Sequence, residues 1–97
     1  MKIPDKVKIG PIVYDVVIEK FNHNSLTEDK LWGHIEHDEC KIYVNGNVES
    51  QTLDVILFHE VLHGFERTYG LNLKENDVIR ISHAIVDFLK ENNLLKE

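Results

Sequence analysis

Alternating apolar and polar residues in the first half of the chain are typical of short β-strands. Four runs carry this pattern: Val7 to Ile9, Ile12 to Ile18, Leu31 to His37 and Lys41 to Val44. The breaker pair Gly10-Pro11 separates the first two runs and predicts a hairpin, and Asn45-Gly46-Asn47 is a strong turn signal after the last. Phe21 to Lys30 is polar and is expected to form a connecting loop. The pattern therefore predicts about four strands, mostly antiparallel.

A helical period replaces this alternation in the second half. From about Ser50 to Tyr69 the sequence predicts a helix, with Ser50 as its N-cap and Gly70 as a left-handed stop. A second amphipathic helix is expected from Asn72 to about Asn93, because no Pro or Gly interrupts it. Its apolar positions are Val78, Ile81, Ile85, Phe88 and Leu89. Strands followed by helices predict an α+β fold, in which a small N-terminal sheet packs on two C-terminal helices.

The first of these helices contains the string His59-Glu60-Val61-Leu62-His63, which spells H-E-x-x-H. Four residues advance a helix by about 400°, so His59 and His63 project from one face and can bind one Zn²⁺. Glu60 lies about 100° around from His59, where it flanks the ion and can act as general base on a bound water. These three residues lie away from the apolar arc of the helix, which leaves that arc free to pack in the core.

A catalytic zinc needs a third protein ligand and leaves its fourth position to water. Glu75 opens the second helix and points broadly inward, so it is the preferred third ligand. The alternative is a capping box, Asn72-Leu73-Lys74-Glu75, in which Glu75 only reaches back to the N-cap amide. His83 is the second candidate, either as the third ligand or as a donor that stabilises the oxyanion of the reaction, and its alternative is a partly exposed helix histidine.

The length and charge of the chain limit its number of domains and its kinds of partner. The chain has 97 residues and a formal net charge of −6, which predicts one domain over residues 1–97 and argues against a nucleic-acid partner. No apolar run is long enough for a membrane span. Cys40 is the only cysteine, and the segment from Met1 to Lys6 lacks the apolar core of a signal peptide. We therefore expect a cytoplasmic protein.

The string H-E-V-L-H, followed by an acidic residue that opens the next helix, resembles the gluzincin branch of the zincin metallopeptidases. The order of hairpin, Leu31 to Glu36, Lys41 to Asn45, metal helix and Glu75-x-x-Val78 resembles the minimal zincin-like proteins encoded by bacteriophages and mobile elements of Gram-positive bacteria. The resemblance covers nearly the whole chain, although its motifs outside H-E-x-x-H are weak patterns.

This resemblance implies a zinc peptidase fold with His59 and His63 as ligands, Glu60 as base and Glu75 as third ligand. It also implies that a strand bordering the cleft, Leu31 to Glu36 or Lys41 to Val44, pairs with an extended peptide or protein substrate. The alternative hypothesis is a non-enzymatic, metal-stabilised protein that binds a host or phage partner through its acidic surface. A fourth protein ligand would favour this alternative, whereas a fourth position open to water would favour the enzyme.

Overall fold

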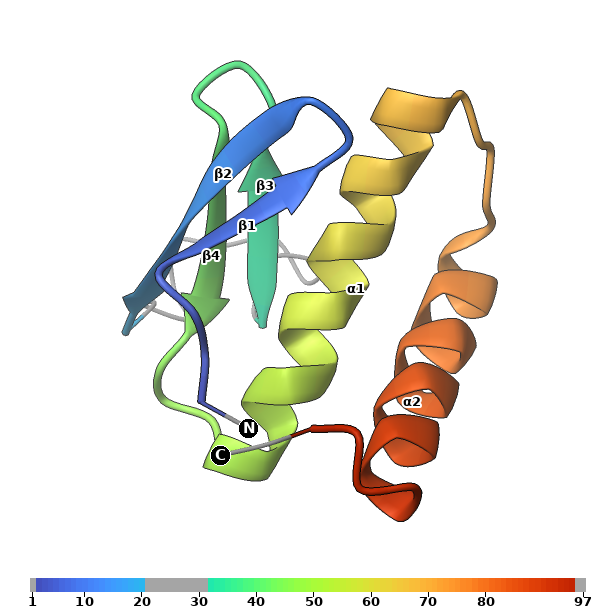
Figure 1. Cartoon of the computed structure of the whole chain (residues 1–97). Coiled ribbons are helices and arrows are strands. Elements are labelled where there is room, and N and C mark those ends of the chain that lie inside the picture. Colours follow the sequence, from blue (N-terminus) through green and yellow to red (C-terminus); the bar gives the residue numbers. More distant parts are fainter. Residues whose placement is uncertain (1, 21–31, 96–97) are drawn as a thin grey trace.

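The computed structural model describes residues 2–20 and 32–95. The strands are β1 (Lys6–Ile9), β2 (Ile12–Glu19), β3 (Gly33–Glu36) and β4 (Lys41–Asn45), and the helices are α1 (Ser50–Tyr69) and α2 (Glu75–Glu91). α1 lies between the sheet and α2 (Figure 1). The predicted α+β fold, four strands followed by two helices, is therefore confirmed. The loop predicted for Phe21 to Lys30 lies outside the described residues.

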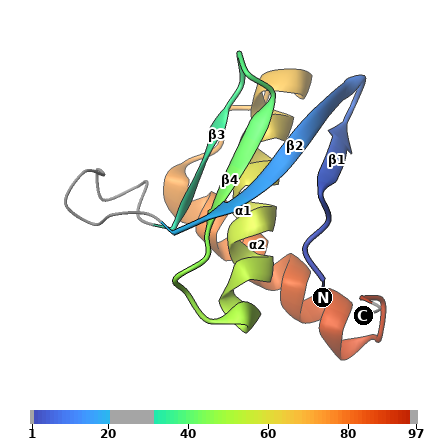
Figure 2. The ribbon, with the colours of Figure 1, turned by 90° about the vertical axis from the view of Figure 1, so that its left-hand side faces the viewer.

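The four strands form one mixed sheet in the order β1-β2-β4-β3. β1 and β2 make the predicted hairpin, and Gly10 in its turn has a φ of 58°, a value that glycine adopts without strain. β4 pairs antiparallel with β3 and parallel with β2. Two of the three pairings are thus antiparallel, and β3 lies at one edge of the sheet. Both helices lie on the same side of this sheet (Figure 2).

Apolar residues of the sheet and of α1 form the main core. Its buried members are Ile9, Tyr14, Ile42, Val44, Ile56 and Leu57. α2 packs on α1 through a line of residues four apart, Val78, Ser82 and Val86. The predicted apolar stripe was therefore partly wrong: Phe88 lies about 120° around the helix from Ser82 and is 59% exposed.

The ends of the helices correct two further predictions. Glu49, not Ser50, is the N-cap of α1, and no side-chain hydrogen bond caps this end. At the other end Gly70 adopts the left-handed conformation, with φ 69° and ψ 34°, as predicted. α2 begins at Glu75 with Lys74 as its N-cap, three residues later than expected. Within residues 2–20 and 32–95, neither helix combines the length and apolar character needed to cross a bilayer.

Candidate metal centre

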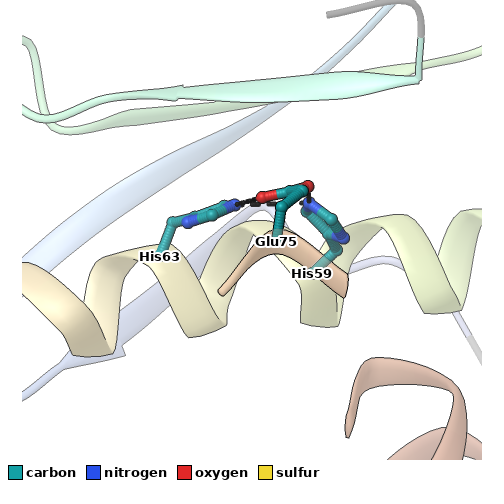
Figure 3. A group of neighbouring side chains, drawn as sticks. All are labelled: His59, His63 and Glu75. Atoms are coloured by element: carbon teal, nitrogen blue, oxygen red, sulfur yellow. Dashed lines mark hydrogen bonds and ion pairs between the residues drawn. The ribbon is translucent and has the colours of Figure 1, made fainter. Parts of the chain in front are cut away.

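Two histidines of α1 and the first residue of α2 converge on one point (Figure 3). His59 and His63 lie about one turn apart on α1, so their rings leave the helix on the same side. Glu75 Oε1 lies 2.8 Å from His59 Nε2, and Glu75 Oε2 lies 3.2 Å from His63 Nε2. The two Nε2 atoms are 3.3 Å apart. The structure thus brings together the three residues that the sequence proposed as ligands.

The separation of the two Nε2 atoms, 3.3 Å, is close to the spacing of donor atoms around a zinc ion. Ligand atoms that lie 2.0–2.1 Å from a tetrahedral zinc are about 3.3 Å from one another. Two imidazoles and one carboxylate are also a ligand set that catalytic zinc takes. Within residues 2–20 and 32–95, only these three residues form a cluster of His, Cys, Asp or Glu that could hold a metal ion, and their ligand atoms lie within 4.8 Å of one another. These three residues could therefore hold a metal ion, and zinc is one that accepts such a ligand set.

Glu75 does not make the capping box offered as its alternative role. No side-chain hydrogen bond caps α2, and Glu75 is itself the first helical residue. Its carboxylate, 53% exposed, instead contacts both histidines. A capping box from Asn72 would need this same carboxylate three residues into the helix. The later start of α2 therefore goes together with the use of Glu75 at the metal centre.

Glu66 supports His63 from the side opposite the other ligands, although it was not among the predicted site residues. Glu66 Oε1 lies 2.6 Å from His63 Nδ1, and Glu66 Oε2 accepts the backbone N–H of Leu73 at 3.2 Å. Because a carboxylate only accepts, Nδ1 of His63 carries the hydrogen of this contact, and a neutral ring then has its lone pair on Nε2, the nitrogen that faces His59 and Glu75. The spacing of three residues on one helix face is the signal in the sequence that could have revealed this pair.

The environment of His59 favours its neutral form. Burial is the largest cause that lowers the pKa of His59 below the usual 6.5; the Glu75 carboxylate opposes this shift, and His63 and His83 add to it. A metal binds the neutral imidazole and competes with the proton for it. The lowered pKa therefore keeps His59 ready to bind a metal near neutral pH.

A cavity of about 790 Å³ opens beside the ligand group. His59, Glu60 and Glu75 line part of it, and Glu60 is only 6% exposed. The other lining residues include the side chains of Trp32, Thr52, Val55, Ile56, Ile79 and Ser82. Glu60 thus reaches the cavity next to the ligands without belonging to the ligand group itself. Sequence reasoning missed Trp32 and Ile79, because they join the cavity from distant segments.

His83 lines the same cavity from α2. It does not belong to the ligand group, so of the two candidates for third ligand the structure brings Glu75 to the histidines. Its position on the cavity wall is compatible with the other predicted role, a donor toward the oxyanion, which stays a prediction.

A second, more open hollow of about 550 Å³ adjoins His63. Its lining consists of Ile35, His37, His63, Glu66, Arg67 and Leu71. Trp32 at the first cavity immediately precedes β3, and Ile35 at the second hollow belongs to it. β3 therefore runs from one hollow to the other and passes over the ligand group (Figure 3).

Comparisons with known proteins assign neither a family nor a function to this chain. A scan against protein-family models found no match, and neither did searches of the curated proteins and of the solved structures. The resemblance to zincins therefore stays a prediction from the sequence, and the functional argument rests on the geometry of the site.

Proposed function

We propose that the protein is a zinc-dependent metallopeptidase that hydrolyses a peptide bond in a peptide or protein substrate. One observation carries this proposal: His59, His63 and Glu75 converge beside the buried Glu60 at the edge of one cavity. Bound by these three ligands, zinc would supply a Lewis acid that polarises a carbonyl and lowers the pKa of a water.

Glu60 is the candidate for the general base, and its place beside the ligands supports this role. It follows His59 directly, lies about 100° around α1, and lines the cavity together with His59 and Glu75. In the proposed reaction Glu60 takes a proton from the attacking water and later delivers it to the leaving amine. Water and substrate would reach it through the cavity that it lines.

The edge strand β3 supports a substrate that binds in extended form. Among the described strands β3 pairs with β4 alone, and its other edge is where we propose that an extended substrate adds as a strand. The cavity next to Glu60 has apolar walls at Trp32, Ile56 and Ile79. These walls favour a large apolar side chain in the substrate residue beside the scissile bond.

The ligand count favours the enzyme over a metal-stabilised binding protein. A structural zinc is closed by four protein ligands, whereas a catalytic zinc has three and keeps one position open. The described residues offer three donors at this site, and His83 is not among them. A binding protein that acts on a host or phage partner remains the alternative that the experiment must exclude.

The test compares the wild type with Glu60→Gln and His59→Ala. Zinc affinity is measured by competition with a chromophoric chelator, and cleavage is measured on a defined library of short peptides by mass spectrometry of the new termini. Glu60→Gln should keep zinc and lose cleavage by about 100-fold or more, because only the base is removed. His59→Ala should lose both zinc and cleavage.

Two results would contradict the proposal. Cleavage by Glu60→Gln at the wild-type rate would remove Glu60 from the mechanism. A wild-type protein that binds zinc but cleaves no library peptide would favour the non-enzymatic alternative.

A further inference from the structure

We infer that Glu66 is the positioning residue of the metal centre: its single carboxylate fixes the tautomer of His63 and the backbone segment that leads to Glu75. This inference deepens the proposed function and rests on its metal site. It concerns metal affinity, so it can be tested without any peptidase substrate.

The first contact of Glu66 fixes His63. Nδ1 of His63 lies 2.6 Å from Glu66 Oε1, and the Glu66 side chain is 20% exposed, so water only partly screens the contact. With its hydrogen on Nδ1, a neutral His63 can offer only Nε2 as a ligand. A carboxylate that binds the second nitrogen of a metal-ligating histidine holds the ring in place and raises its basicity. The free ring would otherwise divide between two tautomers, one of which cannot bind metal through Nε2.

The second contact of Glu66 fixes the linker between the helices. Glu66 Oε2 accepts the N–H of Leu73 at 3.2 Å, and the main-chain oxygen of Glu66 accepts the N–H groups of Gly70 and Leu71. Leu73 is two residues before Glu75, so the same residue that orients one ligand also holds the approach to another.

The geometry also leaves a place for positive charge. With the hydrogen of His63 on Nδ1, its Nε2 lone pair faces Glu75 Oε2 at 3.2 Å. A metal ion placed between these two acceptors would bind both of them. Glu66 therefore favours the neutral tautomer of His63 whose Nε2 can bind a metal ion beside Glu75.

Two variants separate the contact from the charge. Glu66→Gln keeps the size of the side chain, but its amide has one acceptor oxygen, which cannot replace both Oε1 at His63 Nδ1 and Oε2 at the Leu73 N–H. Glu66→Asp keeps the charge, but its shorter side chain cannot span both partners. Glu91→Gln, at the exposed last residue of α2, removes the same charge away from the site and is the matched control.

Zinc affinity of each protein is measured by competition with a chelator, at a pH above the titration of histidine. Glu66→Gln and Glu66→Asp should each bind zinc about 10- to 100-fold more weakly than the wild type, and Glu91→Gln should bind it equally well. Circular dichroism and urea unfolding of the zinc-free proteins show whether each variant is folded. A purely structural Glu66 would lower the unfolding free energy but leave the zinc affinity of the folded protein unchanged.

A second measurement needs no variant. Nitrogen-15 NMR of the zinc-free wild type, at a pH where the His63 ring is neutral, should find its one ring hydrogen on Nδ1, and the opposite tautomer would overturn the inference. Wild-type affinity in either Glu66 variant would overturn it as well. A wild type that binds no zinc would instead refute the proposed function, so the two failures are distinguishable.

Discussion

Gly64 of α1 lies against Ile9 of β1, and its replacement by alanine tests how tightly the two elements pack. A Cβ at this position would lie 2.5 Å from Ile9 Cδ1, about 1 Å inside an ordinary carbon contact. The same Cβ would meet Ile35 Cδ1 at 3.5 Å and Ile9 Cγ2 at 3.7 Å, both ordinary contacts. The conflict is thus with one terminal methyl group, and Ile9 is 1% exposed, so that methyl is enclosed by the core.

The sign of the effect follows from two opposing contributions. Alanine is favoured over glycine inside a helix by about 1 kcal/mol, whereas overpacking a filled core destabilises by about 2 kcal/mol. Gly64→Ala should therefore lower the free energy of unfolding by about 1 kcal/mol. Ile9→Val removes the methyl group in conflict and alone should lower it by about 1 kcal/mol.

The double variant gives the decisive measurement. In the double variant the overpacking is relieved, and the helix gain of about 1 kcal/mol offsets the Ile9→Val loss of about 1 kcal/mol, so this protein should be about as stable as the wild type. The two changes would then be coupled by about 2 kcal/mol, measured by urea unfolding of all four proteins with circular dichroism. If Gly64→Ala alone stabilises the protein, or if the two changes simply add, the described approach of α1 to β1 is refuted.

The strength of one ion pair and the pH dependence of the unfolding free energy can also be predicted. Lys90 Nζ lies 3.3 Å from Oδ2 of Asp54, whose side chain is 2% exposed, whereas the Lys90 side chain is 41% exposed. Lys90→Met should therefore lower the free energy of unfolding by about 1 kcal/mol, less than the loss expected from a fully buried pair. An equal loss in the control Lys8→Met, at an exposed lysine, would contradict this prediction. Burial lowers the pKa of His37 and of His59 below 6.5, so the unfolded chain takes up protons at higher pH than the folded one. The unfolding free energy of the zinc-free protein should thus be retained above pH 6.5 and decline below it, and His37→Gln should make that decline shallower; an unchanged slope would count against it.

The sequence was informative wherever local geometry decides the structure. The side-by-side position of His59 and His63 follows from a spacing of four residues on a helix, whatever the rest of the fold does. Gly70 ends α1 because the left-handed conformation there suits glycine. Strands and helices were likewise predicted in the right order, since their periodicities of two and 3.6 residues are properties of short segments.

The sequence was less informative where distant segments meet. The parallel pairing of β2 with β4 depends on the path of the chain between β2 and β3, which strand alternation does not encode. Glu75 resembled a capping residue as well as a ligand, and only the folded arrangement brings its carboxylate to the two histidines. Glu66 escaped notice because a glutamate on a partly exposed helix face is common and needs no special role.

The contacts of α2 determine which part of the candidate site can separate from the rest of the protein first. Among the described elements α2 contacts α1 and no strand of the sheet, yet it contributes Glu75 to the ligand group and Ile79, Ser82 and His83 to the cavity. If α2 swings away, the third ligand and one cavity wall leave together while the sheet and α1 keep their core. Metal and an apolar substrate would then each favour the docked position of α2, so each would raise the affinity for the other by the same factor.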